Sequence, residues 1–224
     1  MNKFKIVNST DSADLYIYDA IGDWFDEVSA KQFKAEIDEI EGKLLNLHIS
    51  SPGGSVFEGN TIANLIKSRK GTTVCFIEGL CASIATQIAL SCDEVKMYKN
   101  SLFMIHRAMC GCVGNAKDFN KQANDLMIID NVLAQTYVDK TGLDMETILN
   151  YMDEETWFDS TQCKELGFID EIIEESQMVA KFDLDSVENF KHIPKELIDM
   201  TNSNNKNLNF ENEKEQLLLE LDLI

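Results

Sequence analysis

The sequence has little histidine, little positive charge and no long apolar run, and each shortage narrows the function. Only three histidines occur in 224 residues, so few side chains can act as a general base near neutral pH. Lysine and arginine number 20 against 39 aspartates and glutamates, which gives a formal net charge of −19. Nucleic-acid binding calls for a clustered basic face, and these cations are scattered among acids. We therefore expect no nucleic-acid partner.

No apolar run approaches the roughly 20 residues that span a bilayer, so we expect no membrane association. The first six residues also lack the apolar stretch of a secretory signal. Of the six cysteines, Cys75, Cys81 and Cys92 lie in apolar segments, which predicts buried, reduced thiols and a cytoplasmic protein. Cys110 and Cys112 form the only close pair and lack the second pair of a zinc site, so neither a metal nor a cofactor is expected.

Strand and helix patterns alternate through the first half of the chain, which predicts an α/β fold with one sizeable core. Ser29 followed by Gln32 is an N-cap pattern, and Gly42 is expected to end the helix that it opens. The expected strands are 14–18, 44–50, 72–77, 94–98 and 102–106, and the segment 168–173 is expected to close the compact region. The expected helices are 29–42, one that follows Gly54 and ends at Gly71, 84–90, 116–140, 145–152 and 160–166.

The helix expected over 116–140 has apolar residues on much of its circumference, which predicts packing against a partner subunit. Composition changes after about residue 176. An asparagine-rich segment over 201–209 has the character of a linker, and leucines alternate with acids over 213–224 as in a tail helix or docking peptide. We therefore expect a folded domain over 1–175 and an acidic extension over 176–224.

One serine and one histidine each stand at the end of an apolar strand pattern. Ser83 lies in EGLCASIA, where the strand is expected to break at glycine and the serine to open a helix, and His106 closes SLFMIH. A serine there is either a helix N-cap or a nucleophile, and the histidine is either structural or a general base. His48 competes as a base but lies inside an expected strand, and His192 lies in the extension.

The run SPGGS over 51–55 follows an expected strand and opens a helix. Consecutive glycines allow the backbone to approach a ligand closely and direct N–H groups toward it, although the run is also a simple tight turn. A nucleotide-binding P-loop is a poor fit to this run because the GxxxxGK[ST] pattern is absent.

Taken in order, these motifs resemble ClpP, the proteolytic subunit of the Clp protease. The runs that carry the resemblance are SPGG at 51–54, GLCAS at 79–83, MIH at 104–106, ETWF at 155–158 and KELGFID at 164–170. The last two resemble especially the ClpP-like head maturation (prohead) proteases of bacteriophages and prophages. The resemblance covers about residues 14 to 173.

The resemblance implies a serine endopeptidase with Ser83 as nucleophile and His106 as general base. It also implies an oxyanion hole made by the backbone N–H groups of Gly54 and Ile84, donors suited to the charge of a tetrahedral intermediate. The acid that orients the histidine is Glu155 when the chain is aligned through Trp157–Phe158 and Gly167. Asp153 is the alternative.

For the fold, the resemblance implies the ClpP/crotonase type, with stacked strand-strand-helix units and a helical handle over about 115–152. In the family, handles interdigitate between heptameric rings, so we expect a homo-oligomer, heptameric and possibly stacked as a tetradecamer. The implied partners are a peptide or unfolded-protein substrate, capsid or scaffold proteins, or an AAA+ unfoldase.

Two departures from the family weaken the unfoldase expectation and the expected mode of substrate binding. The N-terminal segment does not resemble the axial loop that contacts the unfoldase, and residues 107–110 replace the proline and glycine that usually follow the histidine. Two other functions stay open: a crotonase-fold acyl-CoA enzyme, which needs no serine–histidine pair, and a non-catalytic capsid assembly or scaffolding protein. The expected location is the cytoplasm of a bacterial host or phage-infected cell.

Overall fold

The computed structural model describes residues 5–22, 29–40, 42–174, 190 and 192–194. The chain divides into two units, Met1–Lys181 and Phe182–Ile224, and the architecture below is that of the first. The expected linker and leucine-rich tail lie outside the described residues. None of the described helices has both the length and the apolar character needed to cross a bilayer.

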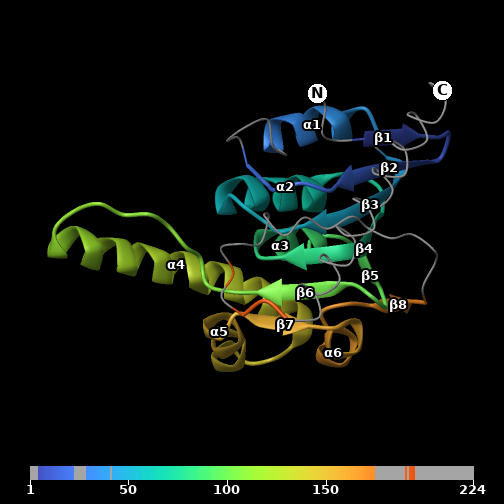
Figure 1. Cartoon of the computed structure of the whole chain (residues 1–224). Coiled ribbons are helices and arrows are strands. Elements are labelled where there is room, and N and C mark those ends of the chain that lie inside the picture. The colour runs from blue at the N-terminus through green and yellow to red at the C-terminus, as the bar shows by residue number, and fades with distance from the viewer. Residues whose placement is uncertain (1–4, 23–28, 41, 175–189, 191, 195–224) are drawn as a thin grey trace, which may run out of the picture. The chain divides into compact units, whose positions relative to one another are not determined.

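A single sheet forms the body of the first unit (Figure 1). Its described strands are β1 (Lys5–Asn8), β2 (Ser12–Ile17), β3 (Leu44–Ser51), β4 (Thr73–Ala82), β5 (Glu94–Tyr98), β6 (Leu102–Ile105), β7 (Thr156–Phe158) and β8 (Glu171–Ile173). The order is β1-β2-β3-β4-β5-β8, and β6 pairs with β4 and β7. Strands β2 to β5 and β8 run parallel, whereas β1 is antiparallel to β2. The predicted α/β class is confirmed.

The described helices are α1 (Ala30–Asp38), α2 (Val56–Ser68), α3 (Ile84–Ala89), α4 (Ala116–Thr141), α5 (Met145–Asp153) and α6 (Ser160–Leu166). Helix α1 packs on α2, and α2 packs on α3. Side chains alternate between the two faces of a strand, so every second residue of β2 and β3 is buried in the core. Leu15, Leu47 and Ile49 on this buried face are fully inaccessible to solvent.

Several expected boundaries were wrong, and tertiary pairing explains the most important one. Strand β4 does not break at Gly79 but runs to Ala82, because its second half pairs with β6. Neither β7 nor β8 was expected as a strand, and β8 forms the last part of the segment 168–173. Helix α1 ends at Asp38, four residues before the glycine that was expected to end it.

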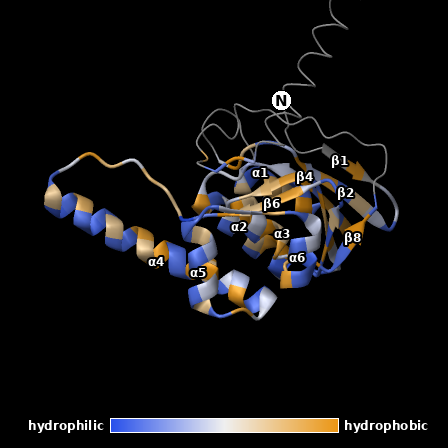
Figure 2. Cartoon of the chain, turned by 60° about the horizontal axis from the view of Figure 1, so that its bottom comes forward, coloured by the Kyte–Doolittle hydropathy of each residue, from blue (hydrophilic) through white to orange (hydrophobic). Residues whose placement is uncertain are grey.

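Helix α4 projects from the body, with its N-terminal end farthest from the sheet (Figure 1). Its N-cap is Asn115, which forms a capping box with Asp118, and Gly142 ends it in the left-handed conformation. Its buried residues begin only at Asp130. The projecting part carries three apolar side chains that are more than half exposed, those of Phe119, Met127 and Ile128. Figure 2 shows apolar segments along this part of the helix. The expected helix over 116–140 is confirmed within one residue.

Candidate active site

Each of three neighbouring strands has a predicted site residue directly beside one of its ends. Ser83 follows β4, His106 follows β6, and Glu155 precedes β7. Strand β6 lies between the other two, parallel to β4 and antiparallel to β7. Since Ile105 pairs with Thr156, the next position along the antiparallel register sets His106 opposite Glu155. The sheet therefore gathers residues that are far apart in the sequence.

The side chains of Ser83 and His106 are in direct contact. The serine Oγ lies 2.7 Å from the histidine Nε2, a hydrogen-bonding distance. Ser83 occupies the N-cap position of α3, but its hydroxyl makes no capping hydrogen bond. Its backbone has φ 55° and ψ −129°, a conformation that costs a non-glycine residue about 1–3 kcal/mol. The hydroxyl is thus held toward the imidazole rather than toward the helix.

The strained turn at Ser83 is held on both sides by hydrogen bonds. Its N–H donates to the Met104 carbonyl at 2.9 Å, and its carbonyl accepts from Thr86 Oγ1 at 2.5 Å. The Thr86 hydroxyl also lies 2.6 Å from the Tyr137 hydroxyl of α4. Burial raises the pKa of Tyr137 to about 12, so the phenol keeps its proton near neutral pH. Helix α4 therefore supports the backbone of the serine through one buried polar contact.

Glu155 is buried and lies near the other nitrogen of the imidazole. Its Oε2 is 4.0 Å from His106 Nδ1, which is longer than a hydrogen bond. Its backbone is left-handed, with φ 49°, and its N–H donates to the Met152 carbonyl at 3.3 Å. Contacts of this kind are often long in the absence of substrate and tighten when it binds.

The alternative acid, Asp153, forms an ion pair with Arg107. Arg107 Nε and Nη2 each donate to one Asp153 oxygen at 2.8 Å, and these hydrogen bonds lower the pKa of Asp153. The Asp153 side chain is 54% exposed, whereas that of Glu155 is 6% exposed. Both oxygens of Asp153 are thus already engaged by a cation.

The glycine run packs against the turn that carries Ser83. A Cβ on Gly53 would lie 2.7 Å from the Ala82 carbonyl oxygen and from Ser83 Cβ, and one on Gly54 would lie 2.1 Å from the Ile21 carbonyl oxygen. Both residues have positive φ, 93° and 145°, which only glycine adopts at little cost. The glycines are therefore required by close backbone packing. The contact with Ile21 was not predicted from the sequence.

Two backbone N–H groups lie in the segments beside the serine hydroxyl. They belong to Gly54, in the loop that packs on the Ser83 turn, and to Ile84, the first residue of α3. Across the described ranges, neither N–H donates to a protein acceptor. Among the described residues, no acceptor competes with a ligand oxygen for either donor.

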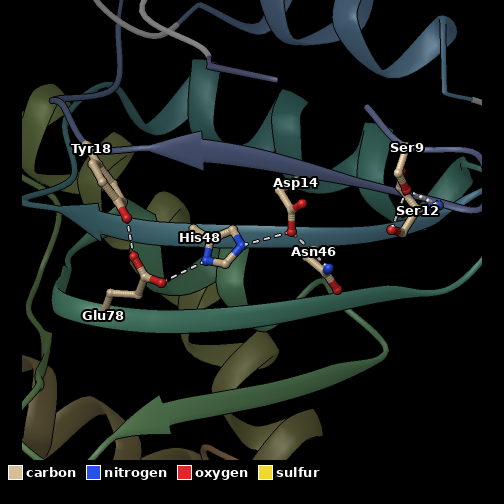
Figure 3. Close-up of polar contacts among 7 residues, drawn as sticks. All are labelled: Ser9, Ser12, Asp14, Tyr18, Asn46, His48 and Glu78. Carbon is tan, nitrogen blue, oxygen red and sulfur yellow. Dashed lines mark hydrogen bonds and ion pairs between the residues drawn. The ribbon is translucent and has the colours of Figure 1, made fainter. Parts of the chain in front are cut away.

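His48 takes part in a polar cluster on the opposite face of the sheet from the buried side chains of β3 (Figure 3). Its Nδ1 lies 2.7 Å from Glu78 Oε1, and its Nε2 lies 3.3 Å from Asp14 Oδ1. Asn46 also donates to Asp14, and the Tyr18 hydroxyl donates to Glu78. The ring is stacked between Tyr16 and Phe76, with centroid separations of 4.5 and 5.1 Å. This imidazole is enclosed by its own partners.

His48 and Glu78 shift each other's pKa. Burial acts to lower the pKa of His48, but the hydrogen bonds and charges of Glu78 and Asp14 outweigh it, so the pKa lies above its ordinary 6.5. Burial acts to raise the pKa of Glu78, but His48 and Tyr18 outweigh it, so the pKa lies below its ordinary 4.5. The histidine thus contributes stability that is full below pH 6.5, and the glutamate contributes stability that is full above pH 4.5.

This linkage predicts a pH-dependent effect of His48→Gln. The loss in Tm, measured by calorimetry, is expected to be about 3–6 °C and largest between pH 4.5 and 6.5. It should shrink as pH rises through the raised pKa of His48, because the imidazole then loses its charge in the native protein as well. Lys34→Gln, which removes an exposed pair with Asp38, is the control and should give a small, flat difference. A His48→Gln effect that is equally flat would contradict the linkage.

The cysteines lie where the apolar pattern places them. Cys75, Cys81 and Cys92 are buried and free, as predicted, whereas Cys110 is exposed and Cys112 partly so. Within residues 5–22, 29–40, 42–174, 190 and 192–194, no group of three or more histidine, cysteine or acidic side chains could hold a metal ion.

The sequence and the fold resemble those of known proteins. A family model described as Clp protease matches residues 7–176. The chain is 29% identical to the ATP-dependent Clp protease proteolytic subunit 1 of Protochlamydia amoebophila, over 73% of this chain and 81% of the relative. It is 26% identical to the corresponding subunit of Bacteroides fragilis, over 68% and 77%. A solved ClpP1 mutant from Listeria monocytogenes superposes with a TM-score of 0.63 at 25% identity and covers 72% of this chain and 91% of its own. The chain therefore belongs to the Clp protease family, whose members are serine peptidases.

Proposed function

We propose that this chain is a serine endopeptidase in which Ser83, His106 and Glu155 form the catalytic triad. The observation that carries the proposal is the 2.7 Å contact between the Ser83 hydroxyl and the His106 imidazole. His106 takes the serine proton through Nε2 as Oγ attacks a peptide carbonyl, and then gives that proton to the leaving amine. Water, deprotonated by the same imidazole, hydrolyses the acyl-enzyme and releases the serine.

The Gly54 and Ile84 N–H groups are proposed to bind the oxyanion of the tetrahedral intermediate. Their lack of acceptors among the described residues supports this role. Two donors fixed in position stabilise charge that develops only as the intermediate forms, which favours the transition state over the bound substrate.

The direct test combines a labelling experiment with a turnover assay. A fluorophosphonate probe should label Ser83 stoichiometrically, and the protein should hydrolyse fluorogenic peptides. Labelling at Ser83 distinguishes the peptidase from a crotonase-fold acyl-CoA enzyme and from a non-catalytic scaffolding protein, because neither needs an activated serine. A folded protein that neither reacts with the probe nor cleaves peptides would contradict the proposal.

The assignment of the acid makes a separate prediction. Glu155→Gln should lower kcat by about 10²–10⁴, because the amide no longer stabilises the imidazolium that forms during attack. Asp153→Asn should lower it by less than about tenfold, because that carboxylate is exposed and bound to Arg107. Steady-state kinetics on fluorogenic peptides measure both variants. The reverse order of effects would give the role to Asp153.

We further propose a cytoplasmic ring oligomer that matures phage or prophage heads by cleaving capsid or scaffold proteins. The exposed apolar side chains of the projecting part of α4 support self-association, since burying them against a partner subunit is energetically favourable. The runs ETWF and KELGFID support the head maturation role. Light scattering should give a large oligomer, and co-expression with a capsid precursor should yield defined cleavage products, whereas co-purification with an AAA+ unfoldase would favour general protein turnover.

A further inference from the structure

The chain that follows His106 is fastened by an ion cluster formed by Arg107, Asp130 and Asp153. Arg107 makes two 2.8 Å hydrogen bonds to Asp153 and a 3.5 Å contact from Nη1 to Asp130 Oδ2. The other Asp130 oxygen accepts the Ala108 N–H at 2.8 Å. The cluster therefore joins three segments: the one after β6, helix α4 and the end of α5.

Asp130 is the best-shielded member of the cluster. It is 5% exposed, and it is the first buried residue of α4, at the point where the helix leaves the body. A buried carboxylate is stable when its oxygens are paired, and both oxygens of Asp130 have partners. Removing Arg107 would leave one of these oxygens without its cation in a largely dry site.

The cluster lies where the chain leaves the sheet, directly after His106. Strand β6 holds the residues before the histidine between β4 and β7, but the chain leaves the sheet at His106 and becomes exposed from Met109 onward. Arg107 and Ala108 anchor the chain at this point through their contacts with Asp153 and Asp130. Asp153 lies two residues before Glu155, so the same guanidinium also holds the approach to the proposed triad acid.

We propose that Arg107 and Asp130 are positioning residues that hold the imidazole of His106 in line with Ser83 and Glu155. This inference rests on the proposed function. Arg107 forms its planar, two-pronged contact with Asp153, and Asp130 holds the following N–H, so the histidine backbone is fixed on the side that the sheet leaves open. The imidazole Nε2 is then held within hydrogen-bonding distance of the Ser83 hydroxyl when the substrate binds.

Kinetics on fluorogenic peptides test the proposal. Arg107→Gln and Asp130→Asn should each lower kcat by about tenfold with KM unchanged, because misplacing the base affects the transition state more than substrate binding. The kcat is expressed per mole of Ser83 labelled at completion by a fluorophosphonate probe. This normalisation corrects the rate for any difference in the amount of folded protein. Arg107→Lys keeps the charge but loses the planar contact, so it should recover part of the rate.

The matched control is Asp139→Asn. Asp139 lies on the same helix, and its carboxylate accepts from Gln135 four residues earlier at an exposed position. This change removes the same charge but should leave kcat within about twofold, as for most exposed substitutions. Unchanged kcat in Arg107→Gln and Asp130→Asn would overturn the proposal, and so would an increase in KM alone.

Hydrogen exchange followed by mass spectrometry separates failure of this inference from failure of the proposed function. Exchange in a peptide spanning residues 106–113 should rise in Asp130→Asn and stay at the wild-type level in Asp139→Asn. If wild-type protein neither hydrolyses peptides nor labels at Ser83, the endopeptidase proposal fails, and faster exchange in Asp130→Asn would still support the anchoring of His106. Exchange that stays at the wild-type level in Asp130→Asn overturns the anchoring whatever the activity.

Discussion

Ser83→Ala should lower peptide hydrolysis by about 10⁴–10⁶, the loss typical when a triad nucleophile is removed. Alanine lacks only the hydroxyl, so the Ser83 N–H bond to Met104 and the carbonyl contacts to Thr86 are retained. The strained φ of 55° is equally costly for either residue. The variant should therefore fold and assemble like wild type, and circular dichroism together with light scattering checks this.

Ser68→Ala serves as the control for the nucleophile. Ser68 is an exposed serine whose hydroxyl donates to the Leu65 carbonyl at the end of α2, and its removal should leave hydrolysis unchanged. Labelling by a fluorophosphonate should vanish in Ser83→Ala and persist in Ser68→Ala. Hydrolysis that survives in well-folded Ser83→Ala would show that another group attacks the substrate.

His106→Ala should reduce hydrolysis by about 10³–10⁶, close to the effect of losing the serine, because the two side chains act as one unit. The rate of fluorophosphonate labelling should fall as well, since the Ser83 hydroxyl needs a base for that reaction too. In the wild-type protein, kcat/KM should decline in acid, because an imidazole that carries both protons cannot accept another from serine. A time course of fluorophosphonate labelling measures the first effect, and the pH dependence of kcat/KM measures the second.

The corresponding control is His48→Gln, which changes the same residue type in another part of the sheet. His48 is enclosed by Glu78, Asp14 and two aromatic rings, so its loss should affect stability and leave kcat near the wild-type value. Loss of hydrolysis in His48→Gln together with its retention in His106→Ala would transfer the role of base to His48.

The sequence predicted what depends on local pattern and missed what depends on pairing between distant segments. Apolar periodicity and capping residues located α4, α5 and α6 within about a residue. The extension of β4 beyond Gly79 and the short strand β7 arise from contacts with β6. Strand β7 consists of residues that favour strands, but a run of three is too short to indicate one, and Gly79 suggested that β4 would break. The ladder that aligns the site was therefore not expected.

Polar contacts between residues far apart in the chain could not be predicted from the sequence either. The shared motifs singled out Ser83 and His106, but Arg107 is separated from Asp130 by 23 positions and from Asp153 by 46. A charged pair of that separation has no periodic signature, because its partner is selected by packing. The cluster around His48 was missed for the same reason: Asp14, His48 and Glu78 belong to three strands that align only in the folded sheet.

The placement of the three candidate residues at strand ends has a consequence for redesign. Consecutive strand residues point to opposite faces, so deleting one residue from β6 or β7 would turn the imidazole or the carboxylate away from the serine, while a substitution at the three positions would leave the backbone alignment intact. New reactivity could therefore be installed by exchanging side chains at 83, 106 and 155, whereas a single-residue change in strand length would dismantle the arrangement altogether.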